Sequence, residues 1–257
     1  MPVTGGTLPG ARTGRDPERA IKRGPRRQPA EVVAATQRER LYDGLVHTVA
    51  QKGYTNARVS DICQAAGVTR PDFYALFAGK EDAFLATYQH GTRVMMSLMD
   101  EAYAAADDWR TGLREALRVL LDVLAAVPAF AVVALVEIDG AGPTARAARD
   151  QLLTDLRRFF TAAPTAIDPD PGGTASTGRE LHGELIDSVV GGVYATIRRH
   201  VAAGRTSDLA SLGPLLGYFM IAPFLGREEA ASELRLAPRA GIGPAPCAPL
   251  DPPATRR

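Results

Sequence analysis

The sequence predicts an all-α fold. Between residues 31 and 226, apolar side chains recur at helical spacing, and no stretch alternates for long with the period of two that is typical of a strand. Glycine and proline interrupt this pattern at intervals that suit helices of ordinary length. The 257 residues are 46% hydrophobic and 23% charged, which excludes a wholly disordered, collagenous or disulfide-framework protein.

Each of the first helices is bounded by its own start and stop residues. The first is predicted to end at Gly53, Gly67 lies in the turn after the second, and Thr69 caps the third, which has Pro71 in its first turn. The predicted helices span, in order, residues 31–52 and 58–65, a third from Thr69, a fourth from Lys80 past Met99, and then residues 109–127, 128–139, 143–163, 179–203 and 207–225.

The two ends of the chain differ in composition from its centre. Residues 1–30 are rich in Gly, Pro and Arg, which predicts a flexible basic arm, and the proline-rich residues 227–257 predict a disordered tail. The longest uncharged apolar stretch, residues 123–136, is shorter than the ~20 residues of a membrane span. The first thirty residues are polar and basic and lack the apolar region of a signal peptide, so we expect none. We therefore expect a cytoplasmic protein without a membrane partner. Its two cysteines and four histidines show no ligand spacing, so we expect neither a metal nor a cofactor.

The charges are distributed unevenly along the chain. Residues 1–80 hold 13 Lys and Arg against 7 Asp and Glu, whereas the remaining residues hold 17 against 22. A basic N-terminal part joined to a mildly acidic remainder favours a polyanionic partner for the first part alone. The alternative is that the basic arm is only a solvated tail that keeps the protein soluble.

Residues 31–80 contain a helix-turn-helix pattern. Two short helices are joined by a glycine-containing turn, and the second opens with a hydroxyl cap followed by a cation. In such a motif the first turn of the second helix enters the major groove of DNA. There Arg70 and Asp72 can reach base edges, while Tyr74 and Lys80 can stand at the phosphate backbone. We therefore predict a DNA-binding domain over residues 31–80 and a separate helical body over residues 81–226.

The residues of this motif also resemble those of a known family. The stretch Leu41 to Leu85 resembles the TetR family of transcriptional regulators through Gly53-Tyr54, Val59-Ser60-Asp61-Ile62, Ala65-Ala66-Gly67-Val68-Thr69, Phe73-Tyr74-Ala75-Leu76-Phe77 and Lys80-Glu81-Asp82-Ala83-Phe84. The resemblance implies a three-helix DNA-binding head on a larger helical body. It also implies that the body binds a small molecule, forms a homodimer, and relieves repression when the molecule is bound.

The sequence departs from the family pattern at the start of the second helix. Where the family commonly has a pair of threonines, this chain has Ala57-Arg58. We expect Asn56 to cap that helix instead and Arg58 to meet a phosphate. The residues predicted to contact DNA are therefore Arg58, Thr69, Arg70, Asp72, Tyr74 and Lys80.

Each of these residues also has an interpretation without DNA. Tyr74 can be a core aromatic like its neighbours, Arg70 a solvated charge, and Asp72 the residue that completes the helix cap. For Asp72 the capping role is the favoured one, and for the other two the contact with DNA is favoured. Lys80 resembles a phosphate-contacting lysine of the family.

Two further groups of residues are predicted in the body. A cavity for a mainly apolar ligand is predicted among the Met, Leu, Val and aromatic side chains Tyr88, Met95, Met99, Trp109, Leu113, Leu117, Phe130, Val133 and Phe160. The resemblance makes the last two helices a dimer interface, with the apolar stripes Leu185, Val189, Val193, Ile197, Leu212, Leu216 and Phe219. Ordinary core packing is the alternative for both groups. Glu137, alone in an apolar helix, is either a helix-end carboxylate or a polar handle for the ligand.

These features together predict a ligand-responsive transcriptional regulator. We expect a homodimeric repressor that binds a palindromic operator in double-stranded DNA and is released by a small apolar molecule. The alternative is a DNA-binding dimer whose body holds no small molecule and serves only for dimerisation or for a protein partner. An enzyme is not supported, since the sequence contains no catalytic triad, carboxylate pair, phosphate loop or metal cluster.

Overall fold

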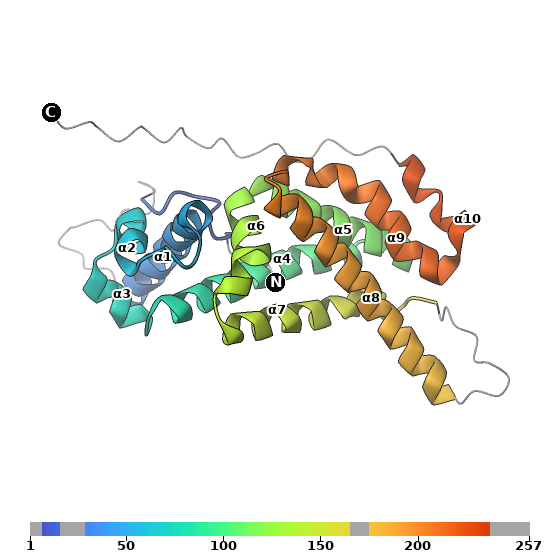
Figure 1. Ribbon diagram of the computed structural model, residues 1–257, viewed down its shortest axis with the longest axis horizontal. Helices are drawn as coiled ribbons and strands as arrows, with labels where there is room; N and C mark the ends of the chain where they lie inside the picture. Colours follow the sequence, from blue (N-terminus) through green and yellow to red (C-terminus); the bar gives the residue numbers. More distant parts are fainter. Residues whose placement is uncertain (1–6, 16–28, 165–174, 237–257) are drawn as a thin grey trace.

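The computed structural model describes residues 7–15, 29–164 and 175–236, and within these ranges the protein is built from helices with no strand (Figure 1). This confirms the predicted all-α fold. Figure 1 shows α1, α2 and α3 gathered at one end of the molecule, while α4 runs from that end into the larger body. The three helices of the head are α1 (Ala30–Lys52), α2 (Val59–Ala66) and α3 (Arg70–Leu76).

The described part of the body consists of seven α-helices with four short 3₁₀ helices between or after them. The α-helices are α4 (Lys80–Ala104), α5 (Trp109–Ala126), α6 (Pro128–Leu135), α7 (Pro143–Leu156), α8 (Ala175–Ala202), α9 (Gly213–Leu225) and α10 (Arg227–Ala230). The 3₁₀ helices are η2 (Glu137–Gly140), η3 (Arg157–Phe160), η4 (Thr206–Leu212) and η5 (Glu233–Arg235). The helix predicted over 207–225 is thus a 3₁₀ segment followed by α9, because Pro214 lacks an N–H and favours the first turn of a new helix.

Helix α4 belongs to both parts of the molecule. Ala83 and Phe84 near its start are buried in the head, and Met95 and Met99 further along are buried in the body. Between them, Gly91 packs so closely against the ring of Phe130 from α6 that a Cβ at this position would overlap the ring. Helix α6 itself turns by 108° from the direction of α5 and packs on α1 as well as on α4.

Residues 7–15 are not the flexible arm that the composition predicts. The backbone N–H of Gly10 donates to Oδ1 of buried Asp43 at 2.6 Å, and the Nε of Arg40 donates to the carbonyl of Gly14 at 2.9 Å. A ring nitrogen of His47 lies 2.9 Å from the carbonyl oxygen of Arg12. The prediction of flexibility over residues 1–30 is therefore wrong for this segment, because a buried carboxylate in α1 needs a donor that the segment supplies. Residues 1–6 and 16–28 lie outside the described residues.

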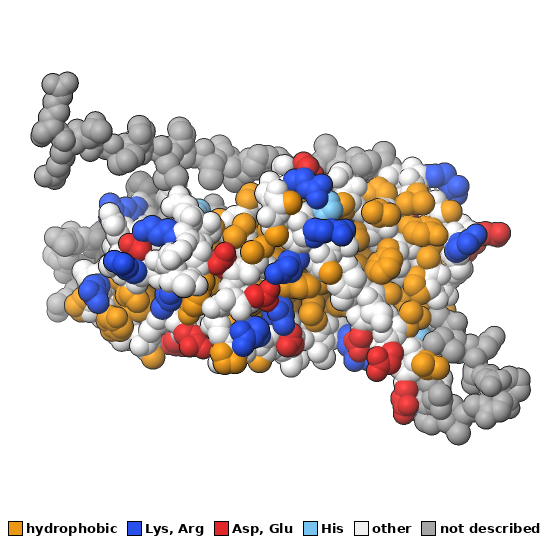
Figure 2. All heavy atoms as spheres, in the orientation of Figure 1, with side chains coloured by type: hydrophobic (Ala, Val, Ile, Leu, Met, Phe, Trp, Pro, Cys, Tyr) orange, Lys and Arg blue, Asp and Glu red, His pale blue; other side chains and the backbone are white. Residues whose placement is uncertain are grey.

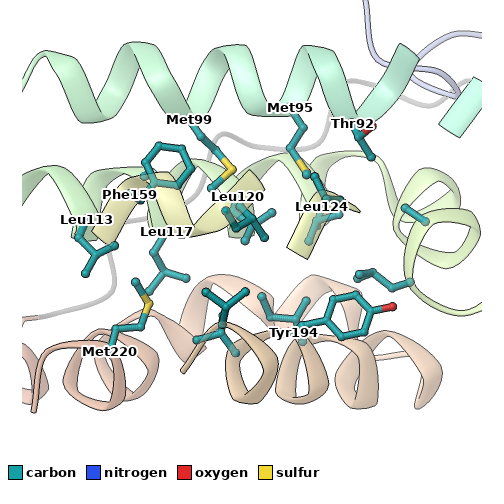
Figure 3. A pocket seen from close by; sticks show the side chains of 18 of the residues that line it. Thr92, Met95, Met99, Leu113, Leu117, Leu120, Leu124, Phe159, Tyr194 and Met220 are labelled. Atoms are coloured by element: carbon teal, nitrogen blue, oxygen red, sulfur yellow. The ribbon is translucent and has the colours of Figure 1, made fainter. Parts of the chain in front are cut away.

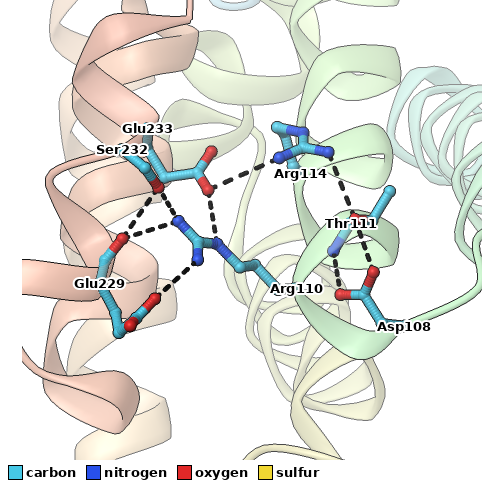
Figure 4. Close-up of polar contacts among 7 residues, drawn as sticks. All are labelled: Asp108, Arg110, Thr111, Arg114, Glu229, Ser232 and Glu233. Carbon is cyan, nitrogen blue, oxygen red and sulfur yellow. Dashed lines mark hydrogen bonds and ion pairs between the residues drawn. The ribbon is translucent and has the colours of Figure 1, made fainter.

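The C-terminal boundary also lies further along the chain than predicted. The carboxylate of Glu233 is buried. Its Oε1 lies 2.8 Å from Nε of Arg110 and 3.6 Å from Nη1 of Arg114 (Figure 4). Arg110 also donates to the backbone carbonyl of Glu229 at 2.7 Å. The body therefore extends to residue 236, and the prediction that the disordered tail begins at 227 is wrong for 227–236. Residues 237–257 lie outside the described residues, as do residues 165–174 between the helices predicted over 143–163 and 179–203.

One helical stretch of the described chain, Thr206–Leu225, is long and apolar enough to cross a membrane by length and composition. Its α9 part packs on α5, α8 and α10, so one face of it belongs to the body. The bent pair α5 and α6 also passes that test when it is taken as a single span, although most of α6 is buried in the protein.

We expect Gly10→Ala to destabilise the protein. Gly10 has φ of +84°, which favours glycine, and a Cβ at this position would lie 2.5 Å from Cγ1 of Val46. The expected loss is ~1–3 kcal/mol of unfolding free energy, measured by urea denaturation. Gly140→Ala is the control, since a Cβ there meets nothing within 4 Å. Equal stability of the two variants would show that residues 7–15 do not pack on the head as described.

Candidate functional site

Helix α3 presents one face to solvent because its other face is anchored in the head. Phe73 is fully buried, together with Ile62 and Cys63 of α2, so α3 lies firmly on the neighbouring helix. Tyr74, the next residue, is 51% exposed, and its ring packs edge-on against that of Phe73 with 5.3 Å between the centroids. Tyr74 is therefore a surface residue, available to a partner outside the chain.

The start of α3 is capped by the side chain of Thr69. The hydroxyl of Thr69 accepts a hydrogen bond from the backbone N–H of Asp72 at 3.3 Å and donates one to Oδ2 of Asp72 at 2.6 Å. Asp72 thus completes the cap, which is the role favoured for it from the sequence. Thr69, Arg70 and Pro71 are all exposed, so the N-terminal end of α3 is open to solvent.

The start of α2 is closed by a different residue from the one expected. Oδ2 of Asp61 accepts a hydrogen bond from the backbone N–H of Arg58 at 3.1 Å and lies 3.1 Å from Nζ of Lys52. The hydrogen bond from Lys52, first, and that from Arg58 lower the pKa of Asp61. Asn56 instead donates to the carbonyl of Lys52 at 3.1 Å, at the end of α1, so the prediction that it caps α2 is wrong. The Arg58 side chain is exposed.

Lys80 is held within the head. Its Nζ donates to the carbonyl oxygens of Tyr54 at 2.7 Å and Ala57 at 3.0 Å, and lies 4.2 Å from the centroid of the Tyr54 ring. Burial lowers the pKa of this ammonium group. Since an ammonium has three N–H donors, at most one is left for a phosphate. The main role of Lys80 in this structure is therefore to link the loop before α2 to the start of α4 by hydrogen bonds.

A cavity of about 70 Å³ with an apolar lining lies in the body beside α4 (Figure 3). Five of the residues predicted to form a ligand cavity line it: Met95, Met99, Leu113, Leu117 and Phe160. The remaining lining residues are outside that predicted set, and two of them, Val193 and Ile197, were predicted for the dimer interface. These remaining residues are Thr92, Ala116, Leu120, Leu124, Ala134, Leu135, Leu152, Leu156, Phe159, Val190, Val193, Tyr194, Ile197 and Met220. Most of them lie on α5, α7 and α8. The apolar residues of these helices recur at the same spacing as in any core helix, so the sequence alone does not distinguish them as cavity residues.

Four of the predicted cavity residues lie elsewhere. Phe130 packs on Gly91, and Trp109 donates from its Nε1 to the carbonyl of Phe159 at 2.9 Å while its ring contacts Phe224. Val133 is fully buried outside the cavity lining, and Tyr88 lines a neighbouring open cleft between α4 and α7. An apolar stripe predicts burial, but it cannot tell a residue beside a void from one in solid packing.

Glu137 joins the two parts of the molecule. Its Oε2 accepts a hydrogen bond from the backbone N–H of Tyr54 at 2.6 Å, so a carboxylate of the body holds the loop that follows α1. The interpretation of Glu137 as a ligand handle is not supported, since it does not line the cavity.

The apolar stripes predicted as a dimer interface face mostly inward. Val189, Val193, Ile197, Leu212 and Leu216 are buried within their own chain, Leu185 is half-buried, and Phe219 alone is exposed, at 41%. The prediction is therefore wrong for the five buried residues. The strongest apolar stripe of each helix packs on its own body, and Val193 and Ile197 line the cavity.

A second apolar face on α8 and α9 is left open instead. Leu215 is 55% exposed beside Phe219, and Leu181 and Ala195 are exposed on α8. Figure 2 shows hydrophobic side chains gathered over α9 and the adjoining part of α8. The small residue Gly191 adds a position where a Cβ would meet nothing within 4 Å. A helix from outside the chain can therefore approach this face closely.

The described residues contain no group of three or more His, Cys, Asp or Glu side chains arranged to hold a metal ion.

Comparison with known proteins relates the head to a family and the whole chain to a fold. Residues 41–87 match the family model of the bacterial regulatory proteins of the tetR family. No curated protein sequence matches the chain significantly. Among solved structures, the fatty acid degradation regulator FadR from Bacillus halodurans is similar with a TM-score of 0.60 at 19% identity, covering 78% of this chain and 96% of its own.

Two other solved structures show a similar arrangement. A TetR-like transcriptional regulator from Rhodococcus sp. RHA1 has a TM-score of 0.55 at 18% identity, covering 78% of this chain and 100% of its own. FadR from Bacillus subtilis in complex with stearoyl-CoA has a TM-score of 0.54 at 20% identity, covering 71% and 97%. At 18–20% identity, the similarity to these solved structures shows a shared fold only. The family-model match over residues 41–87 is a similarity in amino-acid sequence. The N-terminal helix-turn-helix domain of this chain therefore matches the tetR family of bacterial regulatory proteins, and the chain as a whole shares its fold with TetR-like regulators.

Proposed function

We propose that the protein is a homodimeric repressor that binds a palindromic operator through α3 and is released by a small, mainly apolar molecule. The observation that carries this proposal is the apolar cavity beside α4, since the same helix continues into the head. The exposed first turn of α3 supplies the DNA contacts, and the open face of α8 and α9 supplies a surface for a second copy.

The geometry of the head suits insertion of α3 into the major groove. Arg70 is exposed in the first turn, and Tyr74 is one helical turn further along with its ring half in solvent. Arginine pairs well with guanine, and a tyrosine hydroxyl can donate to a phosphate. Two such helices in a dimer must lie about 34–36 Å apart to enter successive major grooves together.

The small size of the cavity supports coupling between ligand and DNA. A volume of about 70 Å³ is well below the ~300–1,000 Å³ typical of ligand pockets, so a ligand must push the lining apart. Met95 and Met99 of α4, with Met220 of α9, are flexible enough to yield. Displacement of α4 changes the position of the head, so ligand and operator favour different conformations and weaken each other's binding equally.

A body without a small-molecule ligand is the alternative. In that case the cavity is a packing defect and α4 is only a linker. The structure of FadR from Bacillus subtilis was solved with stearoyl-CoA, so a body of this fold can hold a ligand with a long apolar chain. At 20% identity that ligand is not transferred to this chain, and our proposal is based on the residues that line its own cavity.

We expect Arg70→Ala to weaken binding to the operator by ~1–3 kcal/mol and to relax the preference at one or two base pairs, since it removes a base contact. Tyr74→Phe is expected to lower the affinity for all DNA sequences to the same extent, because a phosphate contact carries no sequence information. Selection from a random DNA library followed by affinity measurements tests both, with Arg227→Ala on α10 as a control. An unchanged selection profile for Arg70→Ala would remove this residue from base recognition.

We expect Phe219→Glu to give a folded monomer with weakened operator binding. The substitution places a charge on the open apolar face without disturbing the core, since the side chain is 41% exposed. Sedimentation and circular dichroism measure assembly and folding. Leu98→Glu, at a 37% exposed position on α4, is the matched control and should stay dimeric. A dimer that persists in Phe219→Glu would place the interface elsewhere.

We expect Ala134→Leu to fill the cavity and block the ligand with little loss of stability. The matched variant Ala131→Leu lies on the same helix, is also buried, and does not line the cavity. It should lose ~1–3 kcal/mol by overpacking. Thermal shift with a library of apolar compounds, and operator release by any hit, compare the two variants with the unmodified protein. If no compound binds the unmodified protein, the alternative without a ligand is favoured.

A further inference from the structure

The apolar lining of the cavity leaves no place in it for a charged group. Apart from Thr92 and Tyr194, every lining side chain is a hydrocarbon or a thioether. The hydroxyl of Thr92 donates to the carbonyl of Tyr88 at 2.9 Å, and the phenol of Tyr194 lies beside the guanidinium of Arg149. Because an ionised group without a partner is costly to bury, a ligand with a charged end must keep that end outside the cavity.

An open cleft of about 610 Å³ between α4 and α7 adjoins the cavity. Its size is within the ~300–1,000 Å³ typical of ligand sites. Thr92 of α4 and Leu152 of α7 line both spaces, so the cavity and the cleft share a wall. Figure 3 shows Thr92 at the opposite end of the cavity from Leu113. Leu152 is half-buried, so it can turn aside without breaking a hydrogen bond.

The charged side chains of the cleft are distributed along its length. At the end where α4 and α7 finish, Nη2 of Arg158 lies 2.6 Å from Oδ2 of Asp100, and Oδ1 of Asp155 accepts a hydrogen bond from Nε2 of Gln151 at 2.8 Å. Arg93 lies closer to the head and directly follows the wall residue of α4. It is exposed, and within the described chain its guanidinium makes no hydrogen bond or ion pair. The cleft therefore offers an unpaired positive charge beside the shared wall.

We propose that the ligand is an anionic amphiphile, whose apolar chain lies in the cavity and whose carboxylate or phosphate end is held in the cleft by Arg93. The inference rests on the proposed function, in which the cavity receives a small molecule. The chain passes between Thr92 and Leu152, and a guanidinium binds carboxylates and phosphates through parallel N–H donors.

The position of Arg93 also brings the charged end of the ligand close to the head. Burial raises the pKa of Tyr42 on α1, and Arg93 is near enough to counteract this in part. A ligand bound in this way contacts α4 both in the cavity and next to α1, so it can act on the helix that joins the head to the body.

Four probes with the same alkyl chain test the charge of the ligand: octanoate, octyl phosphate, octan-1-ol and octylammonium. Calorimetry measures the affinity of the full-length protein for each. We expect Arg93→Gln to weaken the two anions by about 2- to 5-fold, the range for an exposed ion pair, and to leave octan-1-ol unchanged. Arg93→Glu should weaken the anions further and strengthen octylammonium. Arg227→Gln and Arg227→Glu, at an exposed position on α10, are the matched controls and should change none of the affinities.

The rate of exchange tests the shared wall. We expect Leu152→Ala to raise both the association and the dissociation rate of octanoate, because it removes a side chain from that wall. Stopped-flow fluorescence follows binding through Trp109, the single tryptophan, whose Nε1 donates to the carbonyl of the lining residue Phe159. Leu153→Ala is the control, since Leu153 is also half-buried on α7 but lines neither space.

The outcomes separate this inference from the proposed function. Equal affinities for all four probes, or equal effects of the Arg93 and Arg227 substitutions, would overturn the inference while leaving the cavity as a ligand site. Equal exchange rates in Leu152→Ala and Leu153→Ala would overturn the passage of the chain through the wall. If no probe binds the unmodified protein but another apolar compound does, the inference fails alone. If no compound binds, the proposed function fails with it.

Discussion

The close packing of Phe130 on Gly91 fixes how the head is attached to the body. Because residue 91 has no side chain, the ring of Phe130 reaches the backbone of α4, and α6 is held against the middle of this long helix. The break at Pro128 and the 108° turn from α5 allow α6 to reach this position, from which it also packs on α1. Helices α1, α4 and α6 therefore form one corner shared by both parts of the protein.

Few polar contacts cross this corner. The carboxylate of Glu137 holds the N–H of Tyr54, and residues 7–15 lie over α1, with the carbonyl of Thr7 3.3 Å from a ring nitrogen of His90 on α4. Each such hydrogen bond contributes only about 0.5–1.5 kcal/mol to stability. The head is thus positioned mainly by apolar packing and steadied by a few bonds. Under the proposed function, a shift of α4 would change this orientation by moving the shared corner rather than by breaking many polar contacts.

The sequence predicts the positions of the helices well, but it predicts less well which face of each helix packs against the rest of the protein. Helix positions follow from local periodicity and from residues such as Gly53, Gly67 and Thr69, whose roles depend only on their neighbours in the chain. The cavity and the open face of α8 and α9 depend on which side of each helix meets the body. The predicted interface stripe, including Val193, is buried because the more apolar face of a helix packs inward first. The packing of Gly10 on Asp43 could not be predicted, since it joins residues 33 positions apart.

The cavity and the open face both lie along α8, which bears on how a ligand would act under the proposed function. Val193 and Ile197 line the cavity, while Ala195 between them is exposed on the opposite side of the helix. A ligand that enlarges the cavity can push α4 away, displace α8, or do both. If a second copy packs on the exposed side of α8, that helix gains rigid support and α4 becomes the element that yields. Dimerisation would then direct the expansion toward the head, so the apolar face would contribute to ligand response as well as to assembly.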